Sequence, residues 1–454
     1  MSGVNKMGLF QVTPWCIRFK CDRGINTVNR LILVLLTLSL LSCVAYGKYG
    51  GGSGTLGDPY LIYTAEQMNT IGLNPDDWNA RFALMANIDL GVYTGDQFNI
   101  IGRWTNTKGF TGSFGGSFDG RGHAIRNFTY CVSDGNSLDP LHMDSVGIFG
   151  CIYSHSWPPF DEPVIKDIVL IDPNVDVGSG HYVGALVGRM ISGTISRCSV
   201  QNGSVSGNTN VGGLIGGTYC TSLSSGLKLL DCSVSCRVTG MKHVGGIAGV
   251  YDGCFDSVIF KCSSMSEVFG ETIAGGLVGF CRDTIDSCFA SGKVIGHSET
   301  GGLVGNIHGI VRNSYSIALV SGITYVGGLV GVNHGTVDHC YSSGLVTGTE
   351  NVGGLIGSLV EESFYPAVVV SESFWDIETS GQTDSASGTG KTTLQMRQRS
   401  TYGGWDFADT WDIAEDQTYP FLRRCAAGDI NGDGTVNFLD FVLMAFHWLE
   451  NNNP

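Results

Sequence analysis

The chain has 454 residues, a formal net charge of -15, 67 Gly and only 15% charged residues. So acidic a chain repels phosphate backbones, which argues against nucleic acid as a partner. Low charge with abundant glycine is typical of many short strands joined by tight turns, and 43% hydrophobic residues are enough for a large core.

Residues 1–47 have the features of a signal peptide. Cationic side chains precede an apolar run from Leu31 to Leu41, and Ala45-Tyr46-Gly47 offers the small residues that cleavage requires. The run is too short to span a bilayer, so we expect no transmembrane span in the mature protein. An alternative is a lipoprotein with its lipid at Cys43. The expected location is extracellular or at the cell surface.

Residues 48–125 are predicted to form a linker and a cap over the first coil. The pair Thr64 and Gln67 has the spacing of a capping box, which predicts a short helix from Ala65 to about Ile71. A solenoid needs such an end, because open strand edges invite aggregation. Three strands are expected around the helix, at residues 60–63, 82–90 and 98–101.

Residues 126–376 are dominated by a repeat. A motif close to Val-Gly-Gly-Leu-Val-Gly recurs, and its last three intervals are 26 residues each. A fixed period of this size predicts stacked repeats that bury their apolar faces against one another. The copies begin at Val183, Val211, Val244, Ala274, Thr300, Val326 and Val352.

One period, such as Gly327 to Val352, contains three short extended pieces and no 3.6-residue pattern. That arrangement describes one rung of a parallel β-helix. About eight rungs are expected. The fold class is therefore all-β, a solenoid with a cap at each end.

One position of the repeat is filled by cysteine or serine. Cys288 and Cys340 share it, with Ser314 between them. Free cysteine is among the most buried residue types, so we interpret the column as inward-facing thiols, with disulfides between stacked rungs as the alternative. Allowing for insertions, the earlier members are Cys198, Cys232 and Cys262. Better disulfide candidates lie off the column, at Cys220, Cys236, Cys254 and Cys281.

The next position carries an aromatic row, which either packs between rungs or stacks on sugar rings. Its members are Phe289, Tyr315, Tyr341 and Phe374.

Carboxylates inside the coils are few. Asp286 and Asp338 share one repeat position, but Arg312 occupies the rung between them. Two rungs span roughly 10 Å, which is too far for a retaining glycosidase pair and marginal for an inverting pair. We therefore predict no catalytic residue and interpret these side chains as a solvated face.

Residues 377–424 are expected to form a polar loop followed by an aromatic cap over the far end. Residues 425–454 form a separate small unit. There, Asp429 to Asp440 follows the pattern D-x-N-x-D-G-x-x-N-x-x-D, in which oxygen ligands surround a hard cation and Gly434 permits the sharp turn. The predicted Ca²⁺ ligands are Asp429, Asn431, Asp433, Thr435 through its carbonyl, Asn437 and Asp440.

The repeat pattern resembles the GLUG repeat of secreted bacterial surface proteins, over about residues 146–376. The resemblance implies a right-handed β-helix and an adhesive or carbohydrate-associated role. Some proteins of this class are attached to IgA-specific zinc metallopeptidases. No His in this chain is followed by Glu, so the His-Glu-x-x-His motif of that peptidase is absent.

The calcium loop resembles a dockerin type I repeat, with Asp at its last ligand position and an amphipathic helix following, from Asn437 to Leu449. Dockerins of cellulosomes have two such repeats and this chain has one, with Phe438-Leu439 where that family carries contacts to cohesin. The partner implied is a cohesin-like domain or another surface protein.

The leading hypothesis is an exported, non-catalytic β-helix that contacts polysaccharide or cell-surface glycans, with a calcium-binding dockerin-like module. One alternative is an extracellular polysaccharide-degrading enzyme on the same fold. The other is a structural stalk of the cell envelope.

Overall fold

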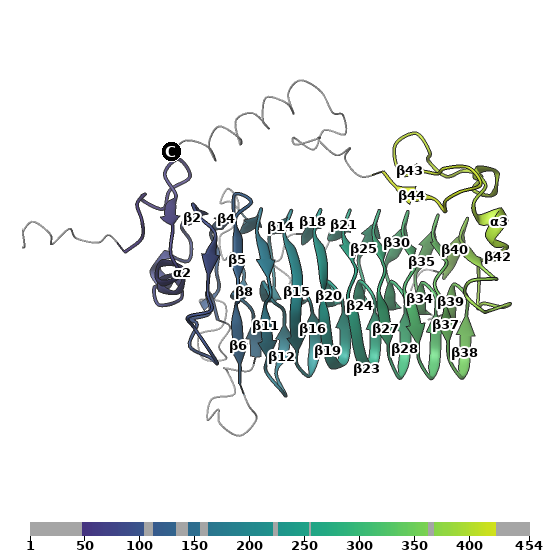
Figure 1. Cartoon of the computed structure of the whole chain (residues 1–454), viewed down its shortest axis with the longest axis horizontal. Coiled ribbons are helices and arrows are strands. Elements are labelled where there is room, and N and C mark those ends of the chain that lie inside the picture. Colours follow the sequence, from purple (N-terminus) through teal and green to yellow (C-terminus); the bar gives the residue numbers. More distant parts are fainter. Residues whose placement is uncertain are drawn as a thin grey trace, which may run out of the picture. The chain divides into compact units, whose positions relative to one another are not determined.

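The computed structural model describes residues 48–103, 112–132, 144–154, 162–220, 226–253, 256–361 and 367–423. The chain divides into two units, Met1–Gly47 and Lys48–Pro454. The predicted signal peptide and calcium loop both lie outside the described residues. The second unit is built almost entirely of parallel strands stacked into a solenoid (Figure 1), which confirms the predicted parallel β-helix.

Each rung contributes strands to three sheets. The first sheet has 11 strands, which in stacking order are β1 (Tyr60–Ile62), β2 (Arg81–Leu84), β4 (Ser117–Asp119), β9 (Val164–Lys166), β14 (Thr194–Ser196), β18 (Lys228–Leu230), β21 (Val258–Phe260), β25 (Thr284–Asp286), β30 (Ile310–Arg312), β35 (Thr336–Asp338) and β40 (Val369–Ser371).

The second sheet has 23 strands, most of them short, because the chain bends along this side of most rungs. In chain order they are β3 (Ile88–Asp89), β5 (Ala124–Arg126), β6 (Thr129–Cys131), β7 (Asp144–Val146), β10 (Val169–Ile171), β11 (Asn174–Asp176), β12 (His181–Val183), β15 (Ser199–Ser206), β16 (Thr209–Gly212), β19 (Ser233–Gly245), β22 (Ser263–Ser264), β23 (Glu267–Gly275), β26 (Phe289–Ala290), β27 (Lys293–Ile295), β28 (Ser298–Gly301), β31 (Tyr315–Ser316), β32 (Leu319–Ser321), β33 (Thr324–Gly327), β36 (Tyr341–Ser342), β37 (Val346–Thr347), β38 (Glu350–Gly353), β41 (Phe374–Asp376) and β42 (Thr389–Lys391).

The third sheet has eight strands, one per rung. They are β8 (Phe149–Ile152), β13 (Val187–Met190), β17 (Ile215–Thr218), β20 (Ala248–Tyr251), β24 (Val278–Cys281), β29 (Val304–Ile307), β34 (Val330–Asn333) and β39 (Ile356–Leu359).

The sequence period sets the register of the stack. Thr284 pairs with Ile310, and Ile310 pairs with Thr336, so neighbours in these rungs of the first sheet are 26 residues apart. Glycines of successive motifs are also superposed, as Gly301 is on Gly327. A Cβ at Gly301 would collide with the carbonyl oxygen of Val304, so the turn from the second sheet to the third requires glycine here.

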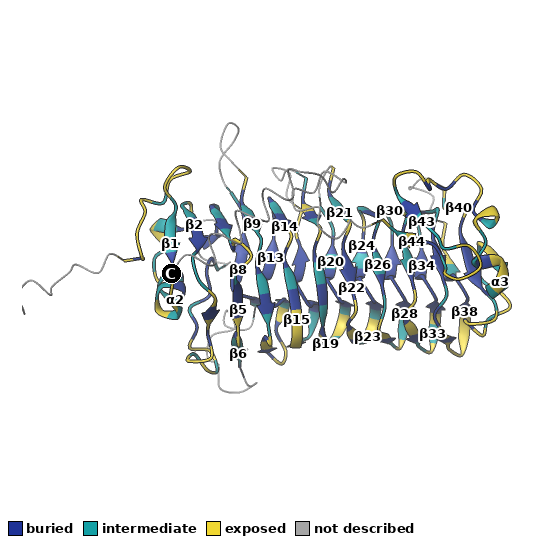
Figure 2. Cartoon of the chain, turned by 45° about the horizontal axis from the view of Figure 1, so that its top comes forward, coloured by how far each residue is buried: buried dark blue, intermediate teal, exposed yellow. Residues whose placement is uncertain are grey.

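The motif's first residue and its leucine or isoleucine point inward and form the core. Val326 and Leu329 are fully buried, and so are their counterparts in the other rungs except Val352, which is partly buried. Figure 2 shows this buried interior running along the stack, with exposure concentrated at the bends. Each rung therefore seals the apolar face of its neighbour, as expected for stacked repeats.

The bend between the first and second sheets is made by a residue with left-handed backbone. Ser287, Asn313 and His339 occupy it in successive rungs, with φ between 48° and 55°. Asp231 and Lys261 fill it in the two rungs before them. This bend turns the following residue, the cysteine or serine of the repeat, into the core.

The stack continues into the amino-terminal part, where β1 pairs with β2 and β2 with β4. The predicted helix is confirmed as α2 (Ala65–Gly72), since Thr64 Oγ1 accepts a hydrogen bond from Gln67 N at 3.3 Å. A 3-10 helix, η1 (Pro75–Asp77), follows it. The expected strand at residues 98–101 is wrong, because only Ile101 forms a bridge, to Phe149.

At the other end, residues 376–392 cover the last rung. Ser385 Oγ accepts hydrogen bonds from the backbone N–H groups of Leu355 and Ile356, at 3.3 and 2.9 Å. Residues 393–423 are called here the C-terminal segment. The segment begins at the far end of the stack, and its aromatic residues then pack on the side of the solenoid, against Tyr315, Tyr341 and Phe374 (Figure 1). The expectation that its aromatic residues cover the far end is therefore wrong.

The C-terminal segment contains the few remaining elements. They are α3 (Thr393–Met396), the 3-10 helix η4 (Arg399–Thr401) and an antiparallel pair, β43 (Trp411–Asp412) with β44 (Phe421–Leu422). Among the described residues, every helix is too short or too polar to cross a membrane.

Candidate binding groove

The cysteine column is a ladder of buried thiols, as predicted. Backbone N–H groups donate across rungs to its sulfur and oxygen atoms: Cys262 N to Cys288 Sγ at 3.3 Å, and Cys288 N to Ser314 Oγ at 3.0 Å. Burial raises the pKa of the Cys198, Cys262 and Cys340 thiols in this column. The ladder members are free cysteines, so the column has a structural role.

The off-column cysteines differ from one another. Cys220 is disulfide-bonded. Cys236 and Cys281 are buried free thiols, so the prediction of disulfides at these two positions is wrong. Cys254 lies outside the described residues.

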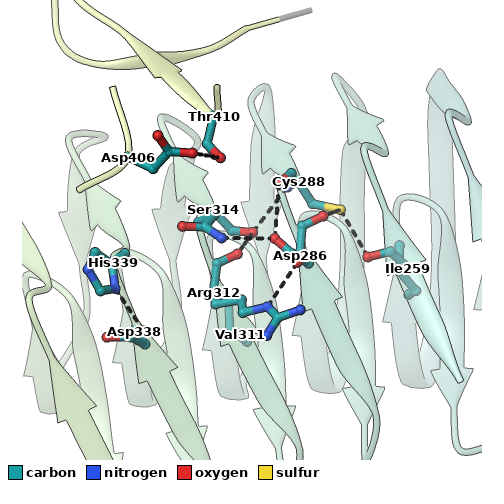
Figure 3. A network of polar contacts seen from close by, with 12 residues as sticks. Ile259, Asp286, Cys288, Val311, Arg312, Ser314, Asp338, His339, Asp406 and Thr410 are labelled. Carbon is teal, nitrogen blue, oxygen red and sulfur yellow. Dashed lines mark hydrogen bonds and ion pairs between the residues drawn. The ribbon is translucent and has the colours of Figure 1, made fainter. Parts of the chain in front are cut away.

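The carboxylates of the coils are held by neighbours rather than turned toward one another. Asp286 accepts a hydrogen bond from Arg312 Nε at 2.8 Å and another from Asn313 Nδ2 at 3.1 Å (Figure 3). Asp338 contacts His339 Nδ1 at 2.7 Å and accepts from Ser371 Oγ at 2.6 Å. Arg312 lies between the two aspartates in the register, as expected, and pairs with the first. Neither carboxylate has the setting of a general acid.

Asp283 is another carboxylate of the coils, and its pKa is shifted toward neutral pH. Burial raises the pKa of Asp283 to about 7, although the Gly253 N–H donates to its Oδ2 and opposes the shift. Its carboxylate neighbour, Asp252, forms an ion pair with Arg282 at 3.0 Å. A glycosidase requires a second, available carboxylate, which this arrangement does not supply.

The aromatic row forms a stack between rungs from Phe289 to Tyr341. Phe289 and Tyr315 have ring centroids 5.1 Å apart and planes within 6°, and Tyr315 and Tyr341 are 4.9 Å apart within 4°. The C-terminal segment covers part of the row, since Tyr341 is only 2% exposed and its hydroxyl donates to Pro420 O at 2.7 Å. Phe289 is half-buried. Packing between rungs is therefore the main role of the row.

A groove of about 530 Å³ lies where the row gives way to serine. Register pairs Phe289 with Ser263, and Ser263 with Ser233, in the two preceding rungs. These small side chains lower the surface beside the ring. The volume falls within the range of ligand sites in proteins. The solenoid wall of the groove is completed by residues of the same rungs: Asp231, Cys232, Phe260, Lys261, Cys262, Asp286, Ser287 and Asn313.

The opposite wall belongs to the C-terminal segment, through Asp409, Thr410, Leu422 and Arg423. Trp411, fully buried, anchors this wall, with ring centroids 6.0 Å from Tyr315 and 4.5 Å from Trp405.

Hydrogen bonds hold the wall in shape. Arg423 Nε donates to Trp411 O at 2.9 Å, joining β43 to β44. Asp406 accepts from Asp409 N at 3.1 Å and from Thr410 Oγ1 at 2.9 Å (Figure 3), and these bonds lower its pKa. A preformed wall of this kind loses little freedom when a ligand binds.

The groove contains charges of both signs. Asp231, Asp286 and Asp409 line it together with Lys261 and Arg423. Burial raises the pKa of Asp231, with Lys261 and Arg197 opposing the shift. Asp286 is paired with Arg312 and Arg423 with Asp412, so Asp231, Asp409 and Lys261 remain and the groove has no net positive charge.

Sequence reasoning identified Phe289 and Asp286 but missed the groove between them. The change from serine to aromatic residues after the cysteine position is readable in the sequence and marks the step. The second wall has no such signal, because its contact with the rungs joins residues far apart in the chain, such as Tyr341 and Trp411.

The predicted calcium ligands, Asp429 to Asp440, lie outside the described residues. Within the part of the chain that the structure describes, no group of three or more His, Cys, Asp or Glu side chains is arranged to hold a metal ion.

Comparison with known proteins gives limited similarity. No family model matches the chain. A segment of 206 residues, 44% of the chain, is 32% identical to Halomucin of Haloquadratum walsbyi. A shorter segment of 53 residues, 11% of the chain, is 45% identical to a "Putative Gly-rich membrane protein" of Evansella cellulosilytica. The chain spans only 2% and 6% of the lengths of these two relatives.

Among solved structures, the chain is similar to one described as "a putative immunoglobulin A1 protease from Bacteroides ovatus". The sequence identity is 18%, the TM-score is 0.44, and the match covers 84% of this chain and 96% of the other.

Proposed function

We propose that the protein is an exported, non-catalytic β-solenoid that binds glycans at the cell surface or outside the cell. The observation that carries the proposal is the groove, in which an aromatic side chain lies beside hydroxyl, carboxylate and cationic groups. Sugar rings pack their apolar faces on aromatic residues, and their hydroxyls exchange hydrogen bonds with such groups. The signal-peptide pattern and the sequence similarity to Halomucin support the location.

The absence of turnover is proposed from the state of the carboxylates. Asp286 is held by Arg312 and Asn313, and Asp338 by His339 and Ser371. A glycosidase needs one carboxyl group to donate a proton and another to act as base or nucleophile. Neither aspartate meets that need.

A glycan array combined with a reducing-sugar assay tests the proposal. Wild-type protein is expected to bind immobilised glycans and to release no reducing ends from the same polymers. Release of product would support the alternative of a polysaccharide-degrading enzyme. Absence of binding across the array would support a structural stalk.

We also propose that residues 425–454 bind Ca²⁺ and dock to a cohesin-like or other surface protein. The support is the sequence alone: oxygen donors at Asp429, Asn431, Asp433, Asn437 and Asp440, with the carbonyl of Thr435, match a calcium loop. Calorimetric titration of the whole chain with CaCl₂ should show one binding event. The double variant Asp429→Ala, Asp440→Ala should abolish it, whereas Asp76→Ala, an exposed acid elsewhere, should not.

A further inference from the structure

We infer that the groove between the serine step and the C-terminal segment is the glycan site, and that it takes uncharged oligosaccharides. This inference rests on the proposed function and adds the location and ligand class. Its first support is geometric. The floor is made by Ser233 and Ser263, which stand in the same register column as Phe289 and replace its ring by a small hydroxyl.

The second support is that the groove has two independent walls. One is the solenoid itself, with Phe289 and Asn313, and the other is the preformed segment that carries Thr410 and Arg423. A chain of sugar rings lying between them can contact the ring of Phe289 from one side and polar groups from both sides. Such convergent polar groups around an apolar surface are typical of small-ligand sites.

The third support is electrostatic and concerns the class of glycan. Carboxylates and cations both line the groove, and once the pairs Asp286–Arg312 and Arg423–Asp412 are set aside no net positive charge remains. Sugar hydroxyls can donate to Asp231 and Asp409 and accept from Lys261 and Arg423. A polyuronate or sulfated glycan would meet a groove without net positive charge, and the chain's net charge of -15 would repel it.

The register of the solenoid offers a variant that fills the groove. Ser263→Phe places an aromatic side chain where Phe289, Tyr315 and Tyr341 have theirs, so it extends an existing stack. Ser199→Phe is the matched control, because Ser199 holds the same register position one rung beyond Ser233 and does not line the groove. Circular dichroism and the melting temperature check that both variants fold.

The measurement is calorimetric binding of cellohexaose, xylohexaose and mannohexaose, with oligogalacturonate as the anionic probe. Wild type and Ser199→Phe should bind at least one neutral hexaose equally well, and Ser263→Phe should bind it at least tenfold more weakly. Phe289→Ala, which removes the ring and leaves the groove open, should weaken binding about tenfold. It serves as the second variant if Ser263→Phe does not fold.

The outcomes separate the inference from the function on which it rests. Unchanged binding by folded Ser263→Phe and Phe289→Ala would overturn the groove as the site and leave glycan binding by the protein intact. Tighter binding of oligogalacturonate than of every neutral hexaose would overturn the ligand class. No binding of any glycan by wild type, here and on the array, would overturn both the inference and the proposed function.

Discussion

Trp411 and Tyr341 pack with ring centroids 6.2 Å apart, and this contact ties the C-terminal segment to the side of the solenoid. The two residues are 70 positions apart in the chain, and Tyr341 already stacks on Tyr315 in the neighbouring rung. The aromatic row thus has two roles. It stabilises the stack internally, and it provides the surface on which the second wall of the groove is built.

We predict that Cys288 stabilises the fold as a hydrogen-bond acceptor and not through any reaction of its sulfur. Cys288→Ala leaves the N–H of Cys262 buried without its acceptor, which should lower the free energy of unfolding by about 1–3 kcal/mol. Cys288→Ser retains an acceptor, as Ser314 does in the next rung, and should be less destabilised. Urea denaturation compares the two variants, and a serine variant less stable than the alanine variant would contradict the prediction.

Asp283 predicts a pH dependence of stability. Its pKa in the folded protein, about 7, lies above the unfolded value, so the folded state binds more protons between about pH 4 and 7. The contribution of this group to stability is therefore lost as the pH rises through that window. Asp283→Asn keeps an acceptor for the Gly253 N–H and should stabilise the protein at pH 8 by up to a few kcal/mol, with little effect at pH 4.

Melting temperatures of Asp283→Asn and wild type across pH 4–8 check this sign. Asp76→Asn, an exposed substitution, is the control and should follow wild type. Equal stabilisation by Asp283→Asn at both ends of the range would show that the charge of Asp283 is not the cause.

The backbone conformation of Ile273 indicates that a substitution there should stabilise the folded protein. It has a φ of 58°, a left-handed conformation that is rare for a β-branched residue, and Asn210 and Asn351 occupy the same bend in other rungs. Ile273→Asn should raise the free energy of unfolding by about 1 kcal/mol, since asparagine tolerates this backbone better. Ile259→Asn, a buried position with ordinary backbone, should be strongly destabilising in the same denaturation assay.

Much of the fold could be predicted because the repeat imposes one register on many residues. The superposed glycines, the inward valines and the buried thiols of Cys198 to Cys340 follow from the repeated motif, with insertions allowed in the earlier rungs, and from the stacking of parallel strands. The helix at Ala65 followed from a local capping pattern. Such features depend on neighbours in sequence or on the next rung, so a single sequence contains them.

The position of the C-terminal segment could not be predicted in this way. Trp405 and Trp411 are apolar enough to cover either the end or the side of the stack, and only the three-dimensional surface decides between these sites. Tyr341 and Phe374 provide a wide aromatic surface on the side, while Ser385 and its neighbours already satisfy the backbone groups at the end. The groove, which needs both walls, was missed for the same reason.

The ion pair of Asp286 with Arg312 predicts a modest structural effect and no effect on glycan turnover. Asp286→Asn should lower the free energy of unfolding by about 1 kcal/mol, because Arg312 is half exposed and solvent screens its charge. A double-mutant cycle with Arg312→Gln should recover a coupling of similar size that falls as salt is added. A reducing-sugar activity in wild type that Asp286→Asn abolishes would contradict the structural role.

The most direct test of the account is a crystal structure of the whole chain soaked with the neutral oligosaccharide that binds best in calorimetry. We predict sugar density in the groove, in contact with Phe289, above Ser263 and beside Thr410. Density for the sugar elsewhere on the solenoid, with the groove empty of it, would contradict the account.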